Sequence, residues 1–395
     1  MAGTGAFGRN HLRVYRELEQ TGAGVQLAAA VEPDSGRAAE TETQYGIPVF
    51  ASVEELLAQG LHIDAASVAV PTVHHHSVAS ALLDAGLDVL LEKPVAATLP
   101  EADDLVTRAE KAGRILQVGH LERFNPAILA VQPRIKRPMF FEAHRLSVFT
   151  PRSLDVDVVL DLMIHDLDIV LTFAASPVRE VRAVGLPIVS PRVDIANVRV
   201  EFDSGCVANF TASRVSTERV RKLRFFEPRQ YVSIDYARRD VLMIRIDDQP
   251  ASAASPELAA AAGEFLSTGK LSSAVIMKLM GSGQIPPALL AQAMAAQGDP
   301  EKLKALAQSL AQPASATQPG PAPGLSFVKP EITPGEPLRL ELESFLESVR
   351  TRREPRVTAR QGRAALALAL EIQDTMAAHA HRAGLQDFFE PRTDA

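Results

Sequence analysis

A glycine-rich stretch lies at the start of the chain: Gly3-Thr4-Gly5-Ala6-Phe7-Gly8. Its G-x-G-x-x-G spacing permits a tight turn and lets the backbone approach a pyrophosphate closely. A helical stretch from Asn10 to Glu19 follows, so a pyrophosphate would rest on the N-terminus of a helix. The pattern alone also arises by chance, and it gains weight from the elements around it. We therefore interpret these residues as a dinucleotide-binding loop at the start of a βαβ unit.

Short apolar runs and helical patterns alternate over the first 120 residues. The apolar runs cover residues 27–31, 65–70, 89–91 and 115–118, and each is too short for a helix. Two of the helices begin with capping-box patterns, at Ser52 and Thr98. This alternation predicts an α/β domain with a doubly wound parallel sheet over residues 1–120.

Glu32 follows the second apolar run at the offset expected for a carboxylate that binds ribose hydroxyls. A negative charge at this position repels the 2′-phosphate of NADP, so the sequence favours NAD over NADP. The alternative is that Glu32 only caps a loop.

The glycine loop should follow a central strand, but only Met1 and Ala2 precede Gly3. Without that strand its neighbours would lose backbone hydrogen-bond partners, which is costly in a buried sheet. We therefore expect the natural start of the protein several residues upstream.

The pattern changes from about residue 137. Val198, Val200 and Phe202 alternate with polar residues, and Asp203-Ser204-Gly205 forms a turn signal before the β-like run 207–212. Further β-like runs cover residues 224–226, 231–236 and 241–246. We expect a second, α+β domain with a largely antiparallel open sheet, made of residues 121–247 and 338–395.

Residues 248–337 interrupt this second domain. Helical pieces are predicted near residues 256–268, 270–280 and 286–310, and the Pro- and Ala-rich stretch 312–324 excludes regular structure. We interpret the segment as an Ala/Pro-rich insertion that ends in a linker. A helical stripe at residues 338–349 and a long helix that begins at Thr358 then complete the chain.

Two polar clusters follow predicted strands and so lie at the carboxyl edge of the parallel sheet, where open α/β folds bind ligands. Glu92-Lys93-Pro94 follows the run 89–91, and its ammonium can hold a developing alkoxide. The alternative is a surface lysine in a loop. Pro71-Thr72-Val73-His74-His75-His76 follows the run 65–70. Adjacent histidines point in different directions and no cysteine cluster is present, so we expect cofactor contact rather than a metal.

Asp161 and His165 are four residues apart on a predicted helix and share a face. A carboxylate that holds an imidazole fixes its orientation and lets it act as a base near pH 7. A structural ion pair explains the spacing equally well, and a metal bound with Asp168 is a weaker alternative. The stretch Gly119–Pro126 forms the hinge to the second domain. It brings Arg123 and Asn125 near the cleft, where Arg123 either meets an anionic substrate or bridges the domains.

Composition narrows the classes of partner. The 395 residues include 41 Lys and Arg against 48 Asp and Glu, a net charge of −7 that gives no support for nucleic acid or a membrane surface. No apolar run approaches the ~20 residues that cross a bilayer. The single cysteine, Cys206, excludes an internal disulfide and fits a cytoplasmic setting.

In this order, the motifs resemble the Gfo/Idh/MocA family of NAD(P)-dependent oxidoreductases over nearly the whole chain, except the insertion. The markers are Gly3–Gly8, Pro71-Thr72-x-x-His75, Glu92-Lys93-Pro94 and Asp161-x-x-x-His165. The resemblance implies a Rossmann domain and a second domain whose open sheet often mediates homo-oligomers. It also implies a catalytic group of Lys93, Asp161 and His165. The expected contacts to NAD are Gly3, Gly5, Ala6, Phe7, Gly8, Glu32, Pro71, Thr72, His75, Glu92, Lys93 and Pro94.

Finer features are similar to a branch of UDP-N-acetylglucosamine 3-dehydrogenases: Gly119-His120-x-x-Arg123-Phe124-Asn125-Pro126-Ala127, residues 161–168 and Thr211-Ala212-Ser213-Arg214. That branch oxidises the sugar 3-hydroxyl so that a partner aminotransferase can install an amine for lipid A-type glycolipids. The implied substrate contacts are Arg123, Asn125, Arg145, His165 and Arg214. Three alternatives stay open: a free polyol such as inositol, another nucleotide sugar, and a non-catalytic NAD-binding sensor or scaffold.

Overall fold

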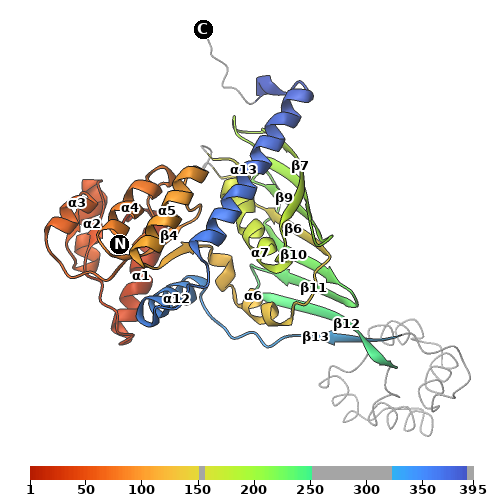
Figure 1. The fold of residues 1–395 in the computed structure, drawn as a ribbon, viewed down its shortest axis with the longest axis horizontal. Helices are drawn as coiled ribbons and strands as arrows, with labels where there is room; N and C mark the ends of the chain where they lie inside the picture. Colours follow the sequence, from red (N-terminus) through yellow and green to blue (C-terminus); the bar gives the residue numbers. More distant parts are fainter. Residues whose placement is uncertain (151–155, 251–322, 389–395) are drawn as a thin grey trace, which may run out of the picture. The chain divides into compact units, whose positions relative to one another are not determined.

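The computed structural model describes residues 1–150, 156–250 and 323–388 (Figure 1). The predicted helical pieces of the insertion and most of its linker lie outside these residues. The chain divides into two compact units, which are described separately. The larger comprises residues 1–228, 232–242 and 330–395, and the smaller comprises residues 229–231 and 243–329.

The N-terminal part of the larger unit alternates parallel strands with helices, as predicted. Its elements are α1 (Ala6–Gln20), β1 (Ala30–Val31), α2 (Ser35–Tyr45), β2 (Val49–Phe50), α3 (Val53–Ala58), β3 (Ala65–Val68), η1 (Thr72–His74), α4 (His75–Asp84), β4 (Asp88–Glu92), α5 (Leu99–Ala112) and β5 (Leu116–Gly119). Both predicted helix starts are confirmed, because the Ser52 hydroxyl accepts from the Glu55 N–H and Thr98 forms a complete capping box.

The parallel sheet consists of two groups of strands, β1-β2 and β3-β4-β5. Between them Ala2 bridges to Val31 on one side and to Val68 on the other, in parallel register. The Ala2 N–H donates to the Ser67 carbonyl, and the Gly3 N–H donates to the Val31 carbonyl, both at 2.8 Å. This short stretch of backbone connects the two groups and leads directly into the glycine loop.

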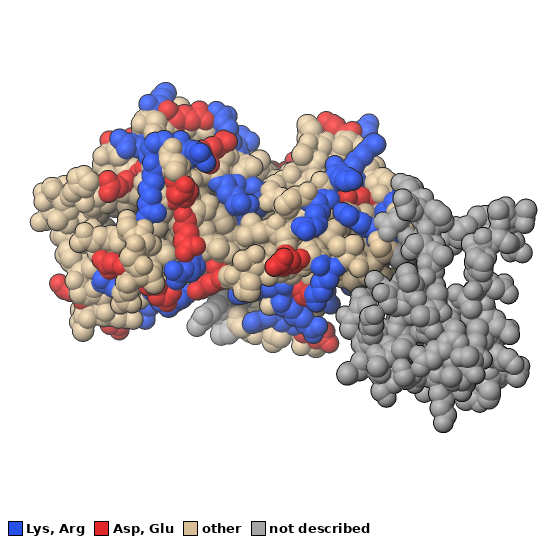
Figure 2. Space-filling model, turned by 90° about the horizontal axis from the view of Figure 1, so that it is seen from below, with Lys and Arg blue, Asp and Glu red and all other residues tan. Residues whose placement is uncertain are grey.

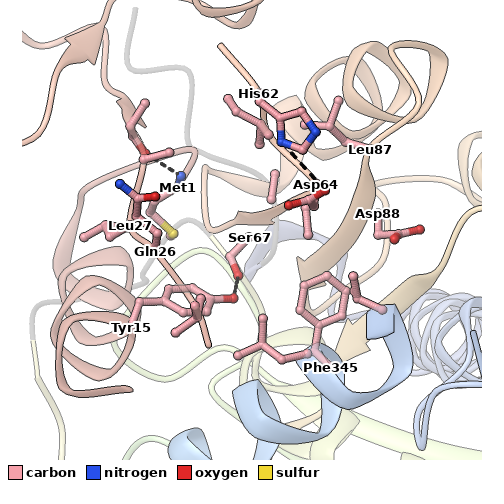
Figure 3. A pocket seen from close by; sticks show the side chains of 18 of the residues that line it. Met1, Tyr15, Gln26, Leu27, His62, Asp64, Ser67, Leu87, Asp88 and Phe345 are labelled. Carbon is pink, nitrogen blue, oxygen red and sulfur yellow. Dashed lines mark hydrogen bonds and ion pairs between the residues drawn. The ribbon is translucent and has the colours of Figure 1, made fainter. Parts of the chain in front are cut away.

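A cavity of about 750 Å³ lies at the amino ends of these strands (Figure 3). Met1, Tyr15, Ser67 and Phe345 border it, and the Tyr15 and Ser67 hydroxyls are 2.6 Å apart. The Met1 nitrogen donates to the Ala29 carbonyl at 2.9 Å. Ligands of open α/β sheets bind at the opposite, carboxyl edge, so this cavity does not border the candidate dinucleotide loop.

The rest of the chain contributes an eight-stranded sheet and the helices that cover it. After β5 come η2 (Leu121–Phe124), α6 (Pro126–Val131), η3 (Gln132–Arg134), β6 (Phe140–Leu146), η4 (Val159–Met163), α7 (Ile164–Ala174), β7 (Val178–Leu186), β8 (Ile195–Phe202), β9 (Val207–Ser213), β10 (Val220–Glu227), β11 (Gln230–Asp235), β12 (Asp240–Pro250), β13 (Pro323–Val328), α12 (Pro337–Thr351), α13 (Ala359–Arg382) and η5 (Gln386–Phe388). The strand order is β13-β12-β11-β10-β6-β9-β8-β7. In this sheet β6 pairs with β9 in parallel, whereas the pairs β6–β10, β7–β8, β8–β9 and β12–β13 are antiparallel. The predicted, largely antiparallel sheet is thereby confirmed.

The two C-terminal helices pack on different parts of the larger unit (Figure 1). α13 contacts β7 and α7 and also reaches β5, where a Cβ on Gly362 would lie 2.6 Å from Val118. In α12, Leu342 and Phe345 share a core with Leu12 of α1. The predicted domain boundaries stay a prediction.

On the face of the molecule seen in Figure 2, side chains of both signs of charge lie among one another. Pairs such as Arg13–Glu17 at 2.7 Å and Arg339–Glu343 at 2.9 Å lie one helical turn apart. Exposed pairs of this kind contribute little to stability. No helix in the described ranges is both long and apolar enough to cross a membrane.

Glu341 of α12 is a buried carboxyl group with no hydrogen-bond partner for either oxygen in the described part of the chain. Burial, together with the charge of Glu92, raises the pKa of Glu341 well above its usual value. The folded state therefore holds this proton more tightly than the unfolded chain does. Stability consequently falls as the pH rises above the unfolded pKa of 4.5.

We expect Glu341→Gln to increase the free energy of unfolding by about 1–3 kcal/mol near pH 8, and by less near pH 5. The amide of glutamine has a similar shape to the carboxyl group and carries no charge. The variant therefore does not have to take up a proton when it folds near pH 8, as Glu341 does. Urea unfolding at both pH values measures the effect, with the exposed Glu347→Gln on the same helix as a matched control. An equal gain at the two pH values would contradict a titrating Glu341.

Candidate active site

The glycine loop has the geometry that its spacing requires. Gly3 has φ of +83°, and a Cβ on Gly8 would lie 2.0 Å from the Gly3 carbonyl oxygen. A Cβ on Gly5 would meet nothing within 4 Å, so this backbone faces open space at the N-cap of α1. The first turn of α1 contains no acidic residue. An anion can therefore approach the free N–H groups at this helix N-terminus.

A cavity of about 590 Å³ adjoins this loop. It lies beyond the carboxyl ends of β1 and β3, and Gly3, Gly5, Glu32, Arg37 and Pro71 contribute to its wall. Its position, its size and the adjacent glycine loop fit the nucleotide half of a dinucleotide.

Glu32 is buried at the rim of this cavity and accepts four hydrogen bonds. Oε2 accepts from the Thr4 N–H at 2.9 Å and from the Thr4 hydroxyl at 3.0 Å. Oε1 accepts from the Asp34 N–H at 3.1 Å and from the Arg37 guanidinium at 2.8 Å. Burial alone would raise the pKa of Glu32, but Arg37 and the backbone donors lower it to about 2. Glu32 is thus ionised, and its pairing with Arg37 was not predicted from the sequence.

Lys93 lies immediately after β4 and reaches the start of the second domain. Its Nζ donates to the backbone carbonyl of Asp161 at 2.9 Å and to that of Leu160 at 3.5 Å. Burial lowers the pKa of Lys93, opposed by the charges of Asp161 and Glu92. The Lys93–Pro94 peptide is cis.

Asp161 lies in the π-helical turn η4, directly before α7. The Asp157 carboxylate accepts from the N–H groups of Val159 at 2.8 Å and Leu160 at 3.1 Å, which caps this turn. In the described parts of the chain no hydrogen bond joins the carboxylate of Asp161 to the ring of His165. Instead, the backbone carbonyl of Asp161 holds Lys93. Single π turns inside α-helices are rare and frequent at functional sites.

His165 lies in the first turn of α7, close to Lys93. Burial, and then the charges of Lys93 and Arg145, lower the pKa of His165 well below its usual value. The imidazole is therefore neutral at pH 7 and able to accept a proton. Its Nδ1 is buried without a hydrogen-bond partner among the residues that the structure describes.

A second histidine, His120, lies beside this centre and was not predicted as a site residue. His120 follows β5 and is 1% exposed, and neither ring nitrogen has a partner in the described ranges. Burial lowers the pKa of His120, and the charges of Asp168, Arg123 and Lys93 act on it. Its place after a strand at the carboxyl edge was the signal that could have identified it.

The arginines expected at the substrate are each held by a buried carboxylate. Arg145 donates to both oxygens of Asp166, at 2.7 and 3.0 Å, and to Glu122 at 3.0 Å. Arg123 lies 3.6 Å from Asp168, and Arg214 lies 3.4 Å from Asp194.

Asn125 is also engaged within the protein. Its Oδ1 accepts from the Ala127 N–H, and its Nδ2 donates to Glu122 and to the Tyr236 carbonyl, all at 3.1 Å. The four side chains Arg123, Asn125, Arg145 and Arg214 thus shape the second domain. Their predicted contacts to substrate stay predictions.

The remaining predicted cofactor residues lie on two neighbouring loops. The ring nitrogens of His75 are 2.7 Å from the Pro94 carbonyl and 3.0 Å from the Val70 carbonyl, so this buried ring joins the loops. Glu92 is paired with His11 at 3.0 Å. Of the others, Pro71 borders the cavity, Thr72 begins η1, Ala6 begins α1, and the exposed Phe7 stacks edge-on against His11. No three His, Cys, Asp or Glu side chains in the described ranges are arranged to hold a metal ion.

Comparison with known proteins agrees with this geometry. Residues 1–120 match the family described as "Oxidoreductase family, NAD-binding Rossmann fold", and residues 128–228 match the GFO/IDH/MocA C-terminal domain. The UDP-N-acetylglucosamine 3-dehydrogenase of Acidithiobacillus ferrooxidans is 39% identical over 235 residues, which cover 59% of this chain and 72% of that enzyme.

The chain belongs to the Gfo/Idh/MocA family of oxidoreductases. It is an enzyme of the dehydrogenase type with a nicotinamide cofactor, as the motifs predicted. A solved structure of the Acidithiobacillus ferrooxidans enzyme has a TM-score of 0.72 and 28% identity, covering 95% of this chain and 96% of its own. The scyllo-inositol 2-dehydrogenase (NAD(+)) of Bacillus subtilis is 26% identical over 229 residues, which cover 54% of this chain and 66% of that protein.

We expect Asp166→Asn to lower the free energy of unfolding by about 3–5 kcal/mol, because it leaves the buried Arg145 guanidinium without its main counter-charge. Urea unfolding measures the loss. Asp161→Asn is the control on the same segment, and we expect a smaller change because that carboxylate accepts no hydrogen bond from the residues described. Unchanged stability of Asp166→Asn would contradict the stabilising role of the Arg145–Asp166 pair.

Proposed function

We propose that this dehydrogenase oxidises the 3-hydroxyl of UDP-N-acetylglucosamine with NAD⁺. The observation that carries the proposal is the position of Lys93 at the carboxyl edge that also bears the glycine loop. Its ammonium is bonded to the Asp161 carbonyl and its charge acts on a neutral His165. The nature of the substrate rests on the similarity to the Acidithiobacillus ferrooxidans enzyme.

The residues of the site then have separate tasks. His165 takes the proton of the sugar hydroxyl, because its imidazole is neutral and lies beside Lys93. Lys93 holds the oxygen by charge, and the Asp161 and Leu160 carbonyls fix its ammonium group. When bound, NAD⁺ supplies the acceptor for the hydride of the sugar carbon. Glu32 holds the ribose, and the glycine loop holds the pyrophosphate.

We propose NAD rather than NADP as the cofactor. Glu32 is ionised and fixed at the rim of the cavity, where its charge opposes a 2′-phosphate. The positive charge of Arg37 would attract a 2′-phosphate, but this guanidinium donates a hydrogen bond of 2.8 Å to the Glu32 carboxylate.

A second candidate is the oxidation of a free polyol, favoured by the similarity to scyllo-inositol 2-dehydrogenase. A non-catalytic NAD-binding sensor has no need for Lys93 and a neutral His165 together. The predicted homo-oligomer, the downstream aminotransferase and the cytoplasmic location belong to the proposed function as predictions.

We expect NADH to form when UDP-N-acetylglucosamine is added to the full chain with NAD⁺, as followed by nicotinamide absorbance. His165→Ala should reduce kcat by roughly 10²–10⁴, the usual contribution of general acid–base catalysis. The affinity for NADH, measured by fluorescence, should stay the same in this variant.

The matched control is His144→Ala, a histidine of β6 outside this centre, which should retain full turnover. Turnover of myo-inositol but not of the UDP-sugar would replace the substrate and keep the chemistry. Near-normal turnover by His165→Ala would remove the proposed base.

We expect Glu32→Gln to shift the preference from NAD⁺ toward NADP⁺, since it removes the negative charge and frees the Arg37 guanidinium for a 2′-phosphate. The ratio of kcat/KM for the two cofactors should change by at least about tenfold, the effect of roughly one charged hydrogen bond. Glu54→Gln, an exposed carboxylate that borders the same cavity, serves as the control. An unchanged ratio would refute the role of Glu32.

A further inference from the structure

The cations near His165 differ in whether a carboxylate already neutralises them. Arg145 lies between Asp166 and Glu122, and Arg123 faces Asp168. Engaging either with a substrate anion would separate a buried ion pair, which costs about 3–5 kcal/mol. A substrate phosphate therefore requires a cation that the protein has left unpaired.

Arg221 of β10 meets this condition. Its side chain makes no hydrogen bond or ion pair with any residue that the structure describes, and it is exposed. In the antiparallel ladder Arg221 is the direct partner of Arg145 on β6, so both side chains emerge on the same face of the sheet. On that face of β10, Leu223 and Phe225 are buried in the core. Arg221 thus lies on the same face of β10 as these buried residues, at the end of the strand where that face becomes exposed to solvent.

Arg221 lies close to the reacting centre, because its ladder partner Arg145 is bonded at 2.7 Å to Asp166, the residue that follows His165. In agreement, burial and then the charges of Lys93, Arg145, His120 and Arg221 lower the pKa of His165. The partial loss of hydration of this guanidinium lowers the pKa of Arg221 itself, and the charge of Arg145 adds to this effect. The nearby carboxylates, Glu122 and Asp166, are already engaged by Arg145. An excess of positive charge therefore remains beside His165.

We infer that Arg221 binds a phosphate group of the substrate, the anionic part that distinguishes a nucleotide sugar from a free polyol. A guanidinium is suited to this contact because its planar fork donates two parallel hydrogen bonds to phosphate oxygens. The inference rests on the proposed function and deepens it, since it assigns the residue that selects a nucleotide-linked sugar. Arg221 is a binding residue for the ground state and takes no part in proton transfer.

The test uses UDP as the probe and the full chain loaded with NADH, with affinity measured by calorimetry. We expect Arg221→Gln to weaken UDP binding by at least about tenfold, the effect of losing a charge-assisted hydrogen bond. Arg221→Lys should restore part of the affinity, because the charge returns without the fork. The affinity of wild type should also fall more steeply with salt than that of Arg221→Gln.

Arg224→Gln is the matched control, since Arg224 belongs to the same strand but alternates to the other face, where it lies 3.7 Å from Glu142. Its UDP affinity should equal that of wild type. In turnover, Arg221→Gln should raise KM for the UDP-sugar with little change in kcat, as expected for uniform binding.

The possible results separate the inference from the proposed function. If Arg221→Gln binds UDP as wild type does and retains its KM, the inference is overturned while the proposed function stands. If wild type binds no UDP and oxidises a free polyol, both are overturned. An equal loss in Arg224→Gln would also overturn the inference, because the effect would then reflect general surface charge.

Discussion

The hydrogen bond from the Lys93 ammonium to the Asp161 carbonyl is the contact on which the site depends. It joins the end of a strand in the parallel sheet to a turn of the second domain. An ammonium in this half-buried position needs oxygen partners, and backbone carbonyls supply them without cancelling its charge. The π turn presents these carbonyls because Asp157 caps it. Lys93 therefore remains a cation that is fixed in place and available to a developing alkoxide.

Buried ion pairs hold α7 against its neighbours around this contact. Asp166 and Asp168 of α7 hold Arg145 and Arg123, while His165 of the same helix stays neutral. The two aspartates thus fix the position of α7, while the described residues provide no hydrogen-bond partner for Nδ1 of His165. Breaking a buried ion pair lowers the free energy of unfolding far more than breaking an exposed one. The main role of Arg123 and Arg145 is therefore to stabilise the fold.

Signals that are local in sequence could be recognised in advance. The caps at Ser52 and Thr98 and the alternation of strands and helices depend on neighbouring residues, and the structure confirms them. Partners distant in the chain could not be deduced. The sequence contains the arginines and aspartates, but only the packed fold shows that Arg145 meets Asp166. Likewise, a spacing of four predicted that Asp161 faces His165, whereas the π turn offers a carbonyl to Lys93 instead.

The same charges that position a substrate also set the strength of the base. Burial, and then the charges of Lys93, Arg145 and Arg221, lower the pKa of His165, which keeps the ring neutral but makes it a weak proton acceptor. An anion bound among these cations would offset their field and raise that pKa again. Lys93 and Arg145 act on the pKa of His165 more strongly than Arg221 does, so losing Arg221 changes the binding of the anion more than the strength of the base.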